Sequence, residues 1–147
     1  MTIRNILASL CAATFAFCIA TAPAHAQATR TWVSGIGNDG NSCTRTSPCL
    51  TFARALTQTA ASGEIDCLDS GGFGAVNIGK SVTINCEGAI GGVQAGNGAT
   101  GITVNVTTND VVYLRGLDII GTSNGVSGIR TRPHYIEVSR SLNPPAG

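Results

Sequence analysis

The chain has 147 residues, of which only 12% are charged, and its nine Lys and Arg residues nearly balance its eight Asp and Glu residues. A chain so close to neutral, with no basic run, gives no electrostatic basis for binding nucleic acid or an anionic membrane surface. Hydrophobic residues make up 43% of it, beside 19 glycines, so a disordered chain is excluded and one small folded domain is expected.

Residues 1–26 are predicted to be a secretory signal peptide. Arg4 gives the positive start, residues 6–20 form an apolar stretch, and small residues at Ala24 and Ala26 predict cleavage before Gln27. A short membrane anchor is the alternative, but the apolar stretch lacks the ~18 unbroken apolar residues of a spanning helix. We therefore expect an exported protein, secreted or periplasmic, without a stable membrane span.

Four cysteines follow the predicted signal peptide: Cys43, Cys49, Cys67 and Cys86. An even number in an oxidising compartment favours two disulfides. Three pairings are formally possible; the short gap between Cys43 and Cys49 favours a local bond, which leaves Cys67 for Cys86. A zinc site is the rival interpretation, but no CxxC spacing occurs and His134 is the one histidine after the signal peptide.

Residues 27–63 are predicted to hold a short strand at 31–34, a turn-rich disulfide loop and one helix. Glycines 35, 37 and 40 match the dinucleotide fingerprint by letter, but no helix follows them, so the match is attributed to glycine content. The helix is expected over 51–61, because Phe52, Ala55, Leu56 and Thr59 share one face. Thr51 would cap its start, and the glycine at 63 would end it.

From residue 64 onward the pattern changes to alternation of apolar and polar residues, which is typical of strands. Short strands are expected at 65–67, 76–78, 82–86, 102–106, 112–114 with 117–119, and 136–138. Val82, Val111 and Ile136 form one series, and Ile102 and Ile129 another, with a spacing close to the mid-twenties. Such a period predicts the stacked coils of a solenoid over residues 64–147, ending in an irregular tail.

Several motifs resemble a known family. The N-terminal part resembles the entry to the helix in bacterial exported right-handed parallel β-helix proteins of the pectate-lyase-like superfold. The segments that carry this likeness are 32–34, Gly37-x-Asp39, Ser47-Pro48-Cys49-x-Thr51-Phe52-x-x-Ala55-Leu56, 63–65 and 71–74. Residues 81–86 and 111–119 resemble its coil strands, with a bend at Gly116. The likeness covers about residues 30–130. It implies an all-β fold: a right-handed parallel β-helix (solenoid) of about three coils with an N-terminal capping α-helix.

In such a fold alternate residues face the core, which gives the expected inward set Ile65, Cys67, Val82, Ile84, Cys86, Val112, Leu114, Ile136 and Val138. Cys67 and Cys86 would then share a facing one coil apart, as a disulfide or as stacked free thiols. The outward set is the candidate ligand face: Asp66, Asn85, Tyr113, Arg115, Asp118 and Glu137. A simple solvated surface is the plainer interpretation of these residues.

Two functions are considered. The leading one is a non-catalytic exported protein that binds glycans or a partner protein at the cell exterior or periplasm, without a cofactor. The alternative is a polysaccharide lyase, in which acids such as Asp66, Asp118 and Glu137 would hold Ca²⁺ and Arg115 would act as base. No catalytic or metal-binding motif is matched residue by residue. This superfold hosts many activities, so the fold alone does not imply catalysis.

The C-terminal part raises a separate expectation. The likeness fades from Thr131, and the chain stops after about three coils. A truncated or frame-shifted member of the family is therefore hypothesised, or an inactive fragment of a lyase. The alternative is a genuine short protein whose Pro144 and Pro145 blunt the last strand edge. If the short chain is the real product, its exposed last coil is expected to be an edge to which another protein can bind; if it is a fragment, the function belongs to the longer protein.

Overall fold

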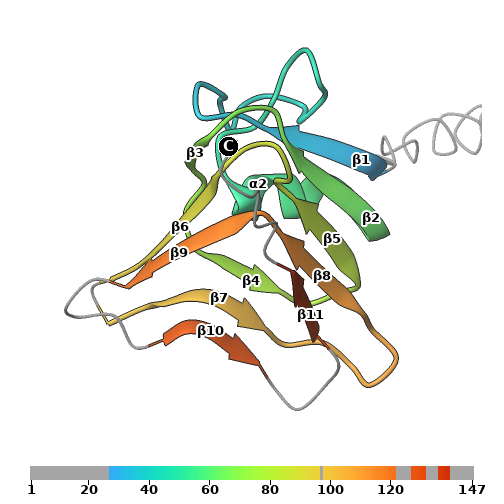
Figure 1. Cartoon of the computed structure of the whole chain (residues 1–147). Coiled ribbons are helices and arrows are strands. Elements are labelled where there is room, and N and C mark those ends of the chain that lie inside the picture. The colour runs from blue at the N-terminus through green and yellow to red at the C-terminus, as the bar shows by residue number, and fades with distance from the viewer. Residues whose placement is uncertain (1–26, 97, 122–126, 132–135, 140–147) are drawn as a thin grey trace, which may run out of the picture.

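The computed structural model describes residues 27–96, 98–121 and 127–131, and the backbone of 136–139 (Figure 1). The predicted signal peptide, His134 and the two C-terminal prolines lie outside these residues. The described part contains one helix and eleven strands, with these bounds: β1 Ala28–Val33, α2 Phe52–Gln58, β2 Thr59–Cys67, β3 Gly71–Gly72, β4 Val76–Ile78, β5 Val82–Asn85, β6 Gly91–Ala95, β7 Thr100–Val104, β8 Val112–Arg115, β9 Leu117–Gly121, β10 Ser127–Thr131 and β11 Ile136–Ser139.

The strands form three parallel sheets, so the all-β prediction is confirmed (Figure 1). One sheet has five strands in the order β1-β2-β5-β8-β11, and two have three strands, in the orders β3-β6-β9 and β10-β7-β4. From β5 the chain visits each sheet in turn through β6 and β7, and β8 returns it to the first sheet beside β5.

The strand register confirms most of the expected spacing. Ile129 pairs with Ile102, as the sequence predicts. In the series of Val82 and Ile136, the middle strand was placed one residue early at Val111, because Val82 and Ile136 both pair with Val112. Because two valines are adjacent here, the alternation alone does not show which of them faces the core. The structure shows it: Val112 is fully buried, whereas Val111 is partly exposed.

The core lies between the sheets, and it takes alternate residues of each strand. Of the expected inward set, Ile65, Val82, Ile84, Cys86, Val112 and Leu114 are all at most 2% exposed. Cys67 is only partly buried against the core. The side chains of residues 136 and 138 lie outside the described part. Phe52 of α2 packs on Phe73, with ring centroids 4.9 Å apart, which fixes the helix against the sheets.

The predicted helix was too long at its C-terminal end. Thr51 caps its start by accepting a hydrogen bond from the Arg54 N–H, as expected. The helix ends at Gln58, however, because Thr59 is extended and its hydroxyl donates to the Ala55 carbonyl oxygen at 2.7 Å. Residues 59–67 are then paired with β1 and β5. Gly63 therefore lies within a strand, and the predicted boundary at 63/64 falls inside β2.

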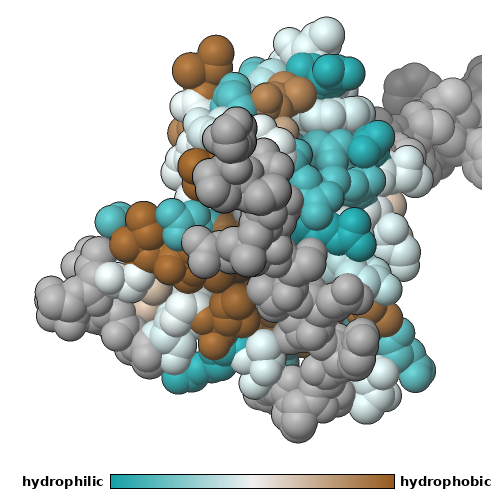
Figure 2. Space-filling model, viewed as in Figure 1, coloured by the Kyte–Doolittle hydropathy of each residue, from teal (hydrophilic) through white to brown (hydrophobic). Residues whose placement is uncertain are grey.

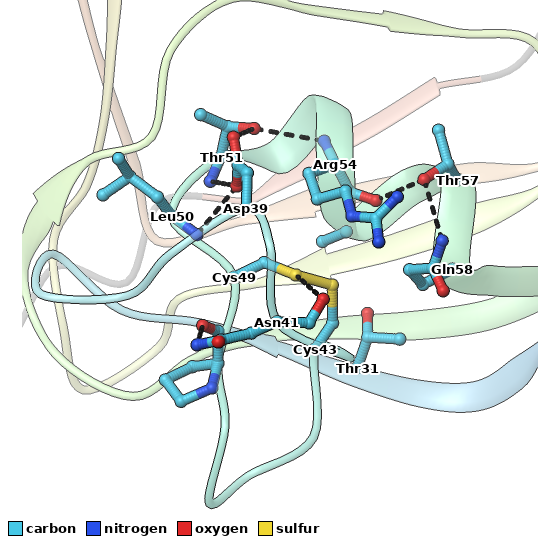
Figure 3. Close-up of a disulfide and its surroundings, with 12 residues drawn as sticks. Thr31, Asp39, Asn41, Cys43, Cys49, Leu50, Thr51, Arg54, Thr57 and Gln58 are labelled. Atoms are coloured by element: carbon cyan, nitrogen blue, oxygen red, sulfur yellow. Dashed lines mark hydrogen bonds between the residues drawn. A yellow bond between two sulfur atoms is a disulfide. The ribbon is translucent and has the colours of Figure 1, made fainter.

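The loop before the helix is held by the Cys43–Cys49 disulfide, which matches the favoured pairing (Figure 3). Asp39 joins this loop to the helix start by accepting hydrogen bonds from the Leu50 and Thr51 N–H groups and from the Thr51 hydroxyl, each at 2.9 Å. Partial burial alone would raise the pKa of Asp39. The hydrogen bonds outweigh burial and lower the pKa below its ordinary value.

Asp110 joins two turns that lie one above the other. Its carboxylate accepts hydrogen bonds from the Thr107 hydroxyl at 2.6 Å and N–H at 3.0 Å, and from the Ser81 hydroxyl at 2.7 Å. These donors, the Thr107 hydroxyl first, lower the pKa of Asp110 to about 2. A lowered folded-state pKa contributes stability above the ordinary value of 3.8, and this stability is lost as the pH falls towards 2.

Replacing Thr107 with valine is expected to raise the pKa of Asp110 from about 2 towards 3.8, because it removes the largest of these stabilising contacts. Titration of the side-chain carboxyl carbon by NMR measures this pKa. The control is Thr108→Val, the same change at an exposed neighbour. An Asp110 that titrates near 3.8 in the unsubstituted protein would contradict the prediction.

No helix in the described residues is long and apolar enough to cross a membrane.

Candidate functional site

The outer side of the five-stranded sheet carries two rows of partly or fully exposed side chains, which we call the outer face. One row runs across successive strands through Arg30, Glu64, Thr83 and Tyr113, and the other through Trp32, Asp66, Asn85 and Arg115. Because the strands are parallel and in register, residues of one row stand ~4.8 Å apart along the sheet. Hydrophilic residues gather over β1, β2 and β5 in Figure 2.

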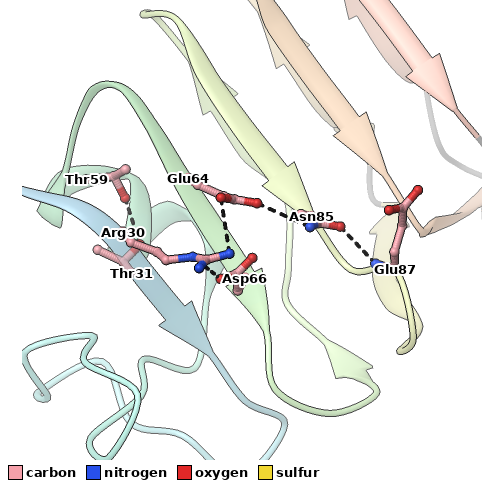
Figure 4. Close-up of polar contacts among 7 residues, drawn as sticks. All are labelled: Arg30, Thr31, Thr59, Glu64, Asp66, Asn85 and Glu87. Carbon is pink, nitrogen blue, oxygen red and sulfur yellow. Dashed lines mark hydrogen bonds and ion pairs between the residues drawn. The ribbon is translucent and has the colours of Figure 1, made fainter.

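Arg30 connects the two acids at the β1 end of the outer face (Figure 4). Its guanidinium pairs with Asp66 through Nε at 2.6 Å and with Glu64 through Nη2 at 3.3 Å. The Asn85 side-chain amide donates to Glu64 at 3.2 Å. The contacts therefore continue across β1, β2 and β5, and they hold the two carboxylates against a single positive charge.

The surroundings of Asp66 disfavour its ionised form. Partial burial raises the pKa of Asp66, the neighbouring charge of Glu64 raises it further, and Arg30 opposes both effects. Because two carboxylates share one arginine, this end of the outer face carries a net negative charge when both acids are ionised. Ligand hydroxyl groups fit this end, because a carboxylate accepts hydrogen bonds from them.

The β8 end of the outer face carries a positive charge instead, on Arg115. The Arg115 guanidinium lies over the Tyr113 ring, 5.6 Å from its centroid, and Arg30 lies over Trp32 in the same way at 6.0 Å. Among the described side chains, no carboxylate pairs with Arg115. Tyr113 and Arg115 thus present a ring and a hydrogen-bond donor side by side on the outer face.

The structure brings together four of the six expected ligand-face residues: Asp66, Asn85, Tyr113 and Arg115. Asp118 points outward as expected, but it does not join these four. It is exposed on β9, in another sheet, because Gly116 turns the chain at a φ of 64° between β8 and β9. The backbone of Glu137 pairs beside Tyr113 on β11, in the other row from Asp66 and two strands beyond Asn85.

The sequence interpretation missed Arg30, Trp32, Glu64 and Thr83, which lie on the same outer face. The signal was present in β2, where Glu64 and Asp66 flank the buried Ile65. In β1, Arg30 and Trp32 alternate with the buried residues Thr31 and Val33. Alternation alone predicts that such residues point outward. It does not predict which strands are neighbours, and so the ion pairs of Arg30 were not foreseen.

The second disulfide joins Cys67 to Cys86, at the ends of the strands that carry Asp66 and Asn85. Beside it lies an open depression of about 470 Å³, lined by Ser70, Cys86, Glu87, Gly88, Ala89, Ile90 and Gly116. Within the described ranges, no three His, Cys, Asp or Glu side chains lie close enough together to hold a metal ion.

Comparison with known proteins gives no relative. No family model matches this chain, and neither a curated protein nor a solved structure matches it.

Proposed function

We propose that the three sheets are the faces of a right-handed parallel β-helix of the pectate-lyase-like kind. The order in which the chain visits the sheets supports this, since each turn returns a strand beside its predecessor, as β8 returns beside β5. The helix α2 packs on β1, β2 and β4, where a cap would close the first coil. The resemblance of residues 30–130 to that family is the other support.

We propose further that the protein is exported. The amino-terminal pattern of a signal peptide and the two disulfides support this, since disulfides persist in oxidising compartments. In this proposal the protein works at the cell exterior or in the periplasm, where it meets polysaccharides and other surface molecules.

The proposed function is non-catalytic glycan binding on the outer face. The observation that carries it is the pair of in-register rows, which combine aromatic rings with hydrogen-bond donors and acceptors on one side of a sheet. An aromatic ring presents an apolar surface to a sugar ring, and neighbouring polar groups fix its hydroxyls. The guanidinium of Arg115 lies beside Tyr113 and pairs with no carboxylate among the described side chains, so it suits a carboxylate on that sugar.

Retention on immobilised polysaccharides tests this proposal. The mature chain is expected to be retained on polygalacturonate, and Arg115→Ala to weaken retention by about tenfold or more, because a hydrogen bond between charged groups contributes roughly 1.5–3 kcal/mol. Arg130→Ala is the matched control, since Arg130 is exposed on β10 in another sheet. Absence of retention on both polygalacturonate and a neutral β-glucan, or equal losses in the two variants, would refute the proposal.

The lyase alternative has weaker support. It needs acids grouped around one Ca²⁺ ion. Asp66, Asp118 and Glu137 instead lie on β2, β9 and β11, and Asp118 belongs to a different sheet from the other two. Release of unsaturated products from polygalacturonate in the presence of Ca²⁺ would establish a lyase and replace the binding proposal.

A second binding function is favoured by the last strands. β9, β10 and β11 each stand at the end of a sheet, so among the described strands each pairs on one side only. Hydrophobic residues gather over β9 (Figure 2), where Ile120 is 54% exposed. Edges of this kind pair with strands of other chains. Sedimentation of the unsubstituted protein and of Ile120→Lys would show whether this end joins chains, because the added charge would abolish such association.

A further inference from the structure

The two disulfides differ in how accessible they are. Cys43 and Cys49 are 1% and 0% exposed, so both sulfurs of that bond lie inside the fold. In the second bond Cys86 is fully buried, but Cys67 is partly exposed at the end of β2. A thiolate must reach a sulfur atom before it can exchange with a disulfide. Only the Cys67 side of the second bond meets that requirement well.

The second disulfide also holds residues of the outer face. Asp66 and Asn85, which precede the two cysteines, are register partners on β2 and β5. Beyond the bond the chain is tightly fitted: a Cβ added to Gly91 would stand 2.6 Å from the Cys86 sulfur. The turn that follows Asn85 forms much of the lining of the 470 Å³ depression. Opening the bond would remove one restraint on this turn. It would also loosen the Asn85 side chain, because the Glu87 N–H in the turn donates to the Asn85 side-chain oxygen at 3.1 Å.

We propose that Cys67–Cys86 is a reducible clip that regulates the outer face, an inference that rests on the proposed glycan-binding function. A dithiol reductant attacks the Cys67 sulfur as a thiolate, which forms a mixed disulfide and releases Cys86 as a thiolate that takes up a proton. The second thiol of the reductant then displaces Cys67 as a thiol. The protein gains two electrons and two protons, and the dithiol becomes a disulfide.

The fold persists in the reduced protein because its main supports do not involve this bond. The backbone pairing of residues 63–66 with 82–85 continues, and so does the buried column of Ile65, Ile84 and Leu114. Reduction therefore acts locally, on the 86–91 turn and on Asn85, whose side chain donates to Glu64 at 3.2 Å. Ligand affinity at the outer face falls while the core stays closed.

The order of reduction tests the clip without any glycan. The mature chain is titrated with dithiothreitol, newly formed thiols are alkylated, and each cysteine is quantified by mass spectrometry. Cys67 and Cys86 are expected to become alkylated at a dithiothreitol concentration about tenfold or more below that for Cys43 and Cys49, because access governs exchange. Simultaneous alkylation of all four, or earlier alkylation of Cys43 and Cys49, would overturn the proposal.

Hydrogen exchange and retention test its regulatory part. In the double variant Cys67→Ala/Cys86→Ala, amides of residues 85–91 are expected to exchange faster while those of β8 keep their protection. Retention on polygalacturonate is expected to weaken, whereas Cys43→Ala/Cys49→Ala is expected to bind as the unsubstituted protein does. Unchanged exchange at 85–91, or unchanged retention, would overturn the clip and leave glycan binding standing. Loss of retention in every form, the unsubstituted protein included, would instead overturn glycan binding, and with it the clip's regulatory role.

Discussion

Replacing Ile84 with alanine is expected to lower the free energy of unfolding by about 2–5 kcal/mol. Ile84 is fully buried on β5, and its register partners Ile65 on β2 and Leu114 on β8 are fully buried as well. Truncation removes apolar contacts with both neighbours. The parallel ladders on either side hold the backbone in place, so the neighbouring side chains cannot collapse into the cavity.

Urea unfolding measures this loss, with fluorescence of Trp32, the sole tryptophan, as the signal. The control is Ile120→Ala, the same truncation at a position that is 54% exposed on β9. A change within about 0.5 kcal/mol is expected there. If Ile84→Ala costs no more than Ile120→Ala, residue 84 does not lie in the core and the stacking of β2, β5 and β8 is wrong.

Replacing Gly116 with alanine is expected to lower the free energy of unfolding by more than about 2 kcal/mol. The residue has a φ of 64°, where a side chain is strained. An added Cβ would also stand 2.4 Å from the carbonyl carbon and oxygen of Cys86. Those backbone atoms are fixed, since the Cys86 N–H donates to the Arg115 carbonyl oxygen at 3.0 Å.

Gly72→Ala is the matched control for Gly116→Ala. A Cβ at Gly72 would meet nothing within 4 Å, and its φ lies outside the left-handed region. We expect a change within about 1 kcal/mol there, because no clash and no backbone strain arise. Thermal and urea unfolding compare the two variants. Equal stability of the two would show that β8 and β9 are not joined by the tight bend at Gly116.

Much of the fold could be predicted, because apolar and polar residues alternate clearly along the strands of this chain. Val82 and Ile84, or Val112 and Leu114, are separated by single polar residues, and burial follows that pattern. The bend at Gly116 and the favoured cysteine pairing were also predicted. These features are local, or they depend only on which side of a strand a residue occupies.

Features that depend on contacts between distant strands could not be predicted. The helical pattern continues to Thr59, yet β2 begins there, and Thr59 meets the Thr31 hydroxyl in the buried interior at 2.8 Å. Pairing of β2 with β1 outweighs the helical preference of Ala60 and Ala61, although alanine is the strongest helix former. The candidate site was predicted only in part for a similar reason. Asp66 was expected to point outward, but its ion-pair partner Arg30 was not predicted, because the sequence does not specify the register of β1 against β2.

Chemical-shift mapping tests the central claim, that the outer face of the five-stranded sheet is the ligand surface. ¹⁵N-labelled mature chain is titrated with soluble oligogalacturonate, and changes are followed at the Trp32 indole, the Asn85 side-chain amide and the Arg115 backbone amide. These three signals, on β1, β5 and β8, are expected to shift together and to saturate at one ligand concentration. Shifts confined to β9 and β10, with these three signals unmoved, would contradict it.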